Sequence, residues 1–130
     1  MEPQKPVSVL VADDDPQLVA FARGVLEAQG CSVSTAADGK EAFRALQGTT
    51  FDLAILGAEM PHIDGRDLLR HMRTEKRLMN IPVIITASEL NSRSRISSDS
   101  FASGALAFLP KPFTEAQLKM MLNTFVGNAL

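Results

Sequence analysis

Residues 51–65 read FDLAILGAEMPHIDG, in which a short apolar run is followed by a loop dense in turn-forming residues. The run ends at Gly57, and Glu59, Pro61 and an Asp-Gly pair follow closely. An apolar run bounded in this way is typical of a strand that is buried on both faces. Such strands usually carry their chemistry on the first residue after the strand, and here that residue has no side chain. Gly57 is therefore either an ordinary turn glycine or a position from which a reactive group is missing.

Similar runs recur along the whole chain, where short β-branched segments alternate with longer amphipathic ones. We predict strands at 7–12, 32–36, 51–56, 82–87 and 105–109, and helices at 16–30, 38–48, 65–78, 90–104 and 114–127. Asp15 is expected to cap the first helix, with Phe21 on its core face and Gly30 at its end. The strand at 32–36 has a wetter face and is expected at a sheet edge. The helix at 90–104 is the weakest, because its serines compete for backbone hydrogen bonds.

This alternation predicts the fold class. Five strands that are apolar enough to be covered on both faces, separated by five helices, predict a doubly wound α/β fold with a parallel sheet. With right-handed crossovers the element count fits a flavodoxin-like strand order of 2-1-3-4-5, whose ligand crevice lies at the carboxyl ends of the strands. The length of 130 residues and the 45% hydrophobic content predict a single domain over residues 1–130.

Composition excludes several classes of protein. Thirteen basic and fifteen acidic residues give a net charge of −2 without a basic block, so we expect no nucleic-acid partner. The apolar runs are too short to span a membrane. The first residues, MEPQKPVSVL, lack the charged-then-apolar order of a signal peptide, and we expect a cytoplasmic protein.

Polar residues collect at the predicted strand ends. Asp13 and Asp14 follow the first strand, Thr86 lies at the end of the fourth, and Lys111 follows the fifth. Two carboxylates 4 Å apart repel by about 4 kcal/mol at an effective dielectric constant near 20, so a hard cation or a lysine is expected beside them. Each residue alone has an ordinary explanation as a cap, a strand residue or a solvated charge. Together on one sheet edge they predict a site for Mg²⁺ and a phosphoryl group.

These motifs, DDDP, MPHIDG, TA and KPF, resemble a response-regulator receiver domain of two-component signalling over essentially the whole chain. The resemblance implies that Asp13, Asp14 and the backbone carbonyl of Glu59 bind Mg²⁺. It also places the phosphorylated aspartate at position 57, where Gly57 stands and supplies no carboxylate. With one negative charge fewer, Lys111 is expected to pair with Asp13 or Asp14, and Mg²⁺ binding is expected to be weak or absent.

The resemblance assigns roles to three further positions. It implies that Thr86 and Lys111 contact the phosphoryl group and that Phe108 is the aromatic residue that reorients on activation. It also implies a cis peptide bond between Lys111 and Pro112, since cis bonds are cheap only before proline.

The leading hypothesis is a pseudo-receiver that is not an enzyme and acts by protein–protein interaction. The resemblance implies a histidine kinase, a phosphotransfer protein or an output protein as partner, and allows a homodimer through the fourth-to-fifth helix face. One alternative is a phosphorylated response regulator that uses a substitute acid, with Asp14, Glu59 or Asp64 as candidates. Another is a small metal-dependent phosphatase-like enzyme, although it too would need a nucleophile at a strand end.

Overall fold

The structure, a computed structural model, describes residues 6–88 and 104–126. Its strands are β1 Ser8–Ala12, β2 Ser32–Ala36, β3 Leu53–Gly57, β4 Val83–Ser88 and β5 Ala107–Lys111, and its helices are α1 Pro16–Ala28, α2 Gly39–Gly48, α3 Gly65–Thr74 and α5 Glu115–Val126. The helix predicted at 90–104 lies, apart from Gly104, outside the described residues. Of the four helices described, none has the length and apolar character needed to cross a bilayer.

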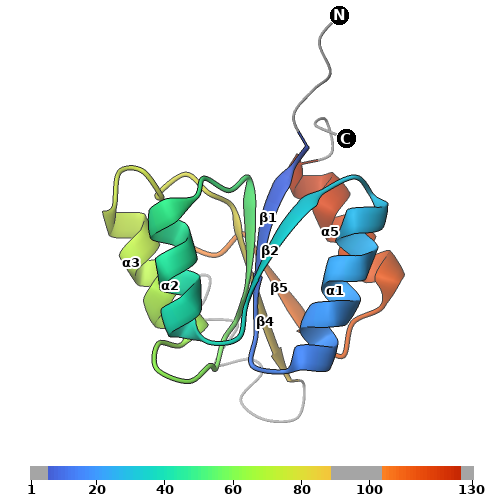
Figure 1. The fold of residues 1–130 in the computed structure, drawn as a ribbon, viewed down its shortest axis with the longest axis horizontal. Coiled ribbons are helices and arrows are strands. Elements are labelled where there is room, and N and C mark those ends of the chain that lie inside the picture. Colours follow the sequence, from blue (N-terminus) through green and yellow to red (C-terminus); the bar gives the residue numbers. More distant parts are fainter. Residues whose placement is uncertain (1–5, 89–103, 127–130) are drawn as a thin grey trace, which may run out of the picture.

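The five strands form one parallel sheet in the order β2-β1-β3-β4-β5, which confirms the predicted flavodoxin-like topology. Helices α1 and α5 cover one face, and α2 and α3 cover the other (Figure 1). Each face has its own hydrophobic cluster, with Leu26 and Leu122 on the α1 and α5 side and Leu46 and Leu68 on the other. β2 lies at the sheet edge, as its wetter face predicted.

Three helices begin at aspartates that accept hydrogen bonds from backbone N–H groups of the first turn. These N-caps are Asp15 for α1, Asp38 for α2 and Asp64 for α3. Each carboxylate satisfies donors that have no partner inside the helix. The predicted cap at Asp15 is confirmed, and Gly30 follows the end of α1 with a left-handed φ of +90° that favours glycine.

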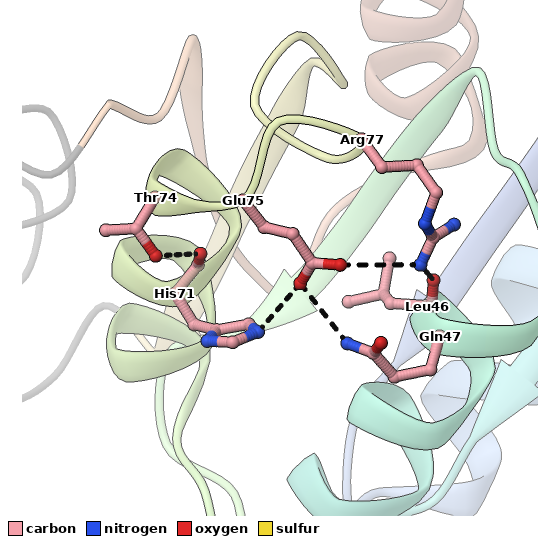
Figure 2. Close-up of polar contacts among 6 residues, drawn as sticks. All are labelled: Leu46, Gln47, His71, Thr74, Glu75 and Arg77. Atoms are coloured by element: carbon pink, nitrogen blue, oxygen red, sulfur yellow. Dashed lines mark hydrogen bonds and ion pairs between the residues drawn. The ribbon is translucent and has the colours of Figure 1, made fainter.

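Helix α3 ends just before Glu75, so the prediction that it reaches residue 78 was wrong. Glu75 has an extended backbone, and its carboxylate accepts a hydrogen bond from the Gln47 amide of α2 at 3.3 Å (Figure 2). Arg77 then donates to the carbonyl oxygen of Leu46, in the last turn of α2 (Figure 2). These contacts with α2 hold the turn after α3, and hydrophobic periodicity gives no sign of them.

Strand β5 spans Ala107–Lys111 rather than the predicted 105–109, which was wrong by two residues. The pairing with β4 accounts for the shift, because it continues past Leu109. Ala87 lies beside Pro110, and Ser88 lies beside Lys111. Proline is tolerated there because β5 is an edge strand. The Lys111–Pro112 peptide is cis, as the resemblance implied. The other boundaries agree with the predictions to within two residues.

Candidate functional site

The candidate site lies where the carboxyl ends of the strands meet, at the lower edge of the sheet in Figure 1. Asp13 directly follows β1, Gly57 ends β3, and Lys111 ends β5. Thr86 on β4 is the register partner of Gly57, and its carbonyl oxygen accepts a hydrogen bond from the Ala58 backbone at 2.8 Å. The parallel sheet therefore brings four of the predicted positions to one edge.

Asp13 is the central charged group of this edge. Its side chain is 1% exposed, and its Oδ2 atom accepts a hydrogen bond from the Lys111 ammonium at 2.7 Å. Its Oδ1 atom accepts a second one from the backbone N–H of Asp15 at 2.9 Å. Both carboxylate oxygens thus have donors, and the buried negative charge has a counter-ion. The expectation that Lys111 pairs with Asp13 or Asp14 is confirmed for Asp13.

Gly57 lies directly beside this carboxylate. A Cβ atom added at Gly57 would lie 2.8 Å from Asp13 Oδ2 and 3.4 Å from the Met60 side chain. Real Cβ atoms essentially never come that close to an oxygen, so a side chain at position 57 requires Asp13 to move. The carboxylate of Asp13 occupies the space in which a side chain of residue 57 would begin.

Sequence reasoning missed a second close contact, at Gly65. A Cβ atom added there would lie 2.2 Å from the carbonyl oxygen of Gly57, and the Gly65 N–H donates to the carbonyl of Ala58 at 3.0 Å. The start of α3 therefore packs against the end of β3, and only glycine permits this approach. The Asp-Gly pair of the sequence was a signal for a turn, but it did not show what the turn packs against.

Thr86 and Phe108 lie on the neighbouring strands β4 and β5. Thr86 is 1% exposed, and among the described residues its Oγ1 atom has no hydrogen-bond partner. A buried hydroxyl in this state costs about 1–3 kcal/mol, and it can donate to an oxygen atom brought to the site. Phe108 on β5 is half-buried, pairs with Ile85 of β4, and packs against the cluster on the α2 and α3 side.

The remaining predicted acids are less enclosed. Asp14 and Glu59 are exposed, and Asp64 uses its Oδ1 atom to cap α3. Within residues 6–88 and 104–126, no three His, Cys, Asp or Glu side chains come together as a metal-binding group. Asp13 already has donors on both oxygens and Gly57 adds no ligand, so the side chains as arranged do not fit a Mg²⁺ ion. The predicted contribution of the Glu59 carbonyl stays a prediction.

An apolar hollow lies next to the site, and the sequence did not predict it. It has a volume of about 490 Å³ between the first turns of α1 and the segment after β5, and Lys111, Leu18, Phe21 and Phe113 are among its lining residues. Phe21 is 42% exposed, so its predicted place on the core face of α1 was wrong. Its ring packs instead against Phe113, with 6.1 Å between the ring centroids.

Comparison with known proteins gives one consistent family. The model of the response regulator receiver domain matches residues 9–123. Response regulator Rre1 of Synechocystis sp. is 30% identical over 124 residues, which are 95% of this chain and 53% of Rre1. The structure of chemotaxis response regulator CheY4 of Vibrio cholerae is similar with a TM-score of 0.86 and 27% identity, covering 94% of this chain and 100% of that chain.

A more distant structure bears on the metal. The receiver domain of sensor histidine kinase PA1611 from Pseudomonas aeruginosa PAO1, with a TM-score of 0.83 and 23% identity, covers 95% of this chain and 99% of its own. That protein has a magnesium ion coordinated in its active-site cleft, and at this identity the likeness shows the shared fold alone. The chain spans about half the length, or less, of the curated relatives that it matches.

Proposed function

This chain belongs to the response regulator receiver domain family, and we propose that it acts by binding other signalling proteins without phosphorylation at position 57. As a member of that family it is a receiver domain of two-component signalling. One observation carries the proposal. At the position that the family resemblance assigns to the phosphorylated aspartate, Gly57 ends β3 beside Thr86 and has no carboxylate to attack a phosphorus atom.

The charges around Gly57 support the proposal. Asp13 lies in the space beside Gly57 and pairs with Lys111 at 2.7 Å, so the site balances its buried charge internally. We propose that Thr86, Lys111 and Phe108 are the remnant of a phosphoryl-responsive site. We further propose that Asp13, Asp14 and the Glu59 carbonyl bind Mg²⁺ weakly if at all.

A substitute acid is less well supported by the geometry. Asp64 caps α3 with one oxygen and lies 3.4 Å from the Arg66 guanidinium with the other. Asp14 and Glu59 are exposed, whereas Thr86, the register partner of Gly57, is buried. A phosphatase-like enzyme needs a nucleophile in the same place. We therefore propose that the chain has no enzymatic activity of its own.

Partner binding would then carry the signal. The exposed Phe21 and the adjoining hollow offer an apolar surface on α1, which suits a histidine kinase or a phosphotransfer protein. Leu106 before β5 and Met120 on α5 are 54% and 68% exposed and suit an output protein or a second copy of the chain. We propose a cytoplasmic, single-domain module over residues 1–130, which in the whole protein can be linked to further domains.

A phosphorylation assay tests the proposal. The parent chain and the Gly57→Asp variant are incubated with Mg²⁺ and acetyl phosphate, and their intact masses are measured. The parent is expected to gain no phosphoryl group, whereas the variant gains one that is labile in base. Because the new Cβ atom meets Asp13 Oδ2 at 2.8 Å, circular dichroism must first show that the variant is folded.

Two outcomes would count against the proposal. Labelling of the parent would favour a substitute acid, and loss of that label in Asp64→Asn or Asp14→Asn would identify it. Turnover of a phosphate ester by the parent would instead favour the enzyme hypothesis. A folded Gly57→Asp variant without label would show that the rest of the site has diverged as well.

A further inference from the structure

We propose that the ammonium of Lys111 is the resident cation of this site and that it excludes Mg²⁺ from Asp13. The Nζ atom lies 2.7 Å from Asp13 Oδ2, and the carboxylate is 1% exposed. The site therefore satisfies its buried anion with a covalently attached cation, whose local supply does not depend on the metal concentration. This deepens the proposed function and rests on it for the meaning of position 57.

Lys111 and Mg²⁺ compete for the same oxygen atom of Asp13. Mg²⁺ binds carboxylate oxygens at about 2.0–2.1 Å in a strict octahedral arrangement. An ammonium at 2.7 Å from Asp13 Oδ2 directs a proton at that oxygen and puts a positive charge next to the position that the metal would take. Repulsion between the two cations is strong at such a distance in a partly buried site. Lys111 and Mg²⁺ therefore cannot both hold this oxygen in the observed arrangement.

Within residues 6–88 and 104–126, Asp13 is the one acid that forms an ion pair with Lys111. A carboxylate at position 57 could hold the lysine while Asp13 held a metal, but Gly57 offers no such group. The space beside Gly57 is filled by Asp13 Oδ2 itself, 2.8 Å from the position of a Cβ atom. Asp14 is exposed, so its pairing with a lysine would be screened by water. Lys111 therefore stays on Asp13.

The inference predicts that removing the lysine charge creates a metal response. The parent, Lys111→Gln and Lys111→Arg are titrated with MgCl₂ by calorimetry at constant ionic strength, without a phosphodonor. Lys111→Gln is expected to bind Mg²⁺ about tenfold or more tightly than the parent, because the amide leaves the Asp13 charge unbalanced. Lys111→Arg keeps the charge and should behave like the parent.

Lys119→Gln is the matched surface control. Lys119 pairs with Glu115 on α5 at 3.2 Å, and its substitution removes the same net charge as Lys111→Gln. It should show no gain in affinity. The inference is overturned if the parent binds Mg²⁺ as tightly as Lys111→Gln, or if a folded Lys111→Gln gains nothing.

A second measurement needs no variant and remains decisive if Lys111→Gln fails to fold. Mn²⁺ added to the isotope-labelled parent should leave the amide signals of Asp13 and Gly57 sharp, whereas selective broadening of them would overturn the inference. The two proposals fail separately. If the parent is phosphorylated but Mn²⁺ leaves its amide signals unchanged, only the proposed function is contradicted. Metal binding by a parent chain that is not phosphorylated would contradict only the proposal that Lys111 is the resident cation.

Discussion

Gly57 leaves the site without a reactive side chain, and it also affects where the Asp13 carboxylate lies. Without a side chain there, the Asp13 carboxylate reaches the end of β3 and bonds the Lys111 ammonium at 2.7 Å. A single added carbon would meet Asp13 Oδ2 at 2.8 Å. Restoring an aspartate at 57 therefore requires Asp13 and Lys111 to rearrange as well. The residue change and the ion pair are coupled, and neither can be interpreted alone.

Gly104 is a residue at which a small substitution should be costly. Its φ is +105°, and an added Cβ would lie 2.8 Å from Nε of Arg73, whose guanidinium donates to the Gly104 carbonyl at 3.0 Å. Burial lowers the pKa of Arg73. Gly104→Ala is expected to lower the free energy of unfolding by about 1–3 kcal/mol, because it strains the backbone and displaces Arg73. Urea denaturation measures the change.

Gly24→Ala is the matched control for that substitution. Gly24 lies in α1, and an added Cβ there meets no atom within 4 Å. Alanine should raise the free energy of unfolding by about 0.5–1 kcal/mol, since it restricts the unfolded chain and favours the helix. Equal effects of the two substitutions would contradict the strain assigned to Gly104.

Cys31 should be an unreactive thiol in the folded protein. It is 7% exposed, and burial raises the pKa of its thiol above the ordinary value. A raised pKa means a smaller thiolate fraction at any pH below it, and the thiolate is the form that reacts. Alkylation by iodoacetamide at neutral pH is expected to be more than about tenfold slower for the native protein than in urea. Mass spectrometry follows the label, and equal rates would show that Cys31 is accessible.

At the scale of elements, the sequence predicted what depends on local pattern and missed what depends on contacts between distant segments. The alternation of strands and helices, taken with right-handed crossovers, fitted the observed sheet order, and the position of Asp15 predicted the cap of α1. The end of α3 depends on Gln47 and Glu75 meeting, and the shift of β5 depends on its register with β4. Hydrophobic periodicity contains neither kind of information.

The same distinction applies to the candidate site. Lys111 was expected beside Asp13 or Asp14 because unlike charges at one sheet edge attract each other, and the structure selects Asp13. That Asp13 fills the space beside Gly57 depends on side-chain direction, which the sequence does not give. The role of Gly65 was missed because a turn signal does not identify the backbone against which the turn packs.

The contacts between α2 and α3 lead to a prediction at this scale. Arg77 donates to the carbonyl oxygen of Leu46, which lies in the last turn of α2 and has no partner within the helix (Figure 2). Glu75 lies 3.8 Å from the same guanidinium. Arg77→Ala should lower the free energy of unfolding by about 1–2 kcal/mol, because it removes a hydrogen bond from a charged donor. Urea denaturation tests it.

Arg70→Ala provides the comparison for Arg77→Ala. Arg70 pairs with Asp67 on the surface of α3, and both side chains are more than half exposed. Exposed pairs of this kind contribute about 0.2–1 kcal/mol, so Arg70→Ala should cost clearly less than Arg77→Ala. The reverse order would mean that the contact with Leu46 does not hold the turn after α3.

At the scale of the whole molecule, the sheet separates two hydrophobic layers. Side chains alternate between its faces, so Ile55 and its register partner Ile84 belong to the cluster under α1 and α5. Ile85 belongs to the cluster under α2 and α3. Residues adjacent in the sheet therefore contribute to different cores. The two layers can accommodate substitutions independently to the extent that no side chain is shared between them.

Double substitutions test this separation. Ile55→Val, Ile84→Val and Ile85→Val should each lower the free energy of unfolding by about 0.5–1.5 kcal/mol. Ile55→Val combined with Ile85→Val should be additive within about 0.5 kcal/mol, because the two methyl groups are lost from opposite faces. Ile55→Val combined with Ile84→Val should deviate from additivity. Both substitutions remove a methyl group from the same cluster, so one relaxation of the surrounding side chains can partly fill both cavities. Denaturant titrations of the three single and two double variants measure both couplings. Equal coupling in the two pairs would mean that strain passes through the sheet, and that a change under α2 and α3 is felt under α1 and α5.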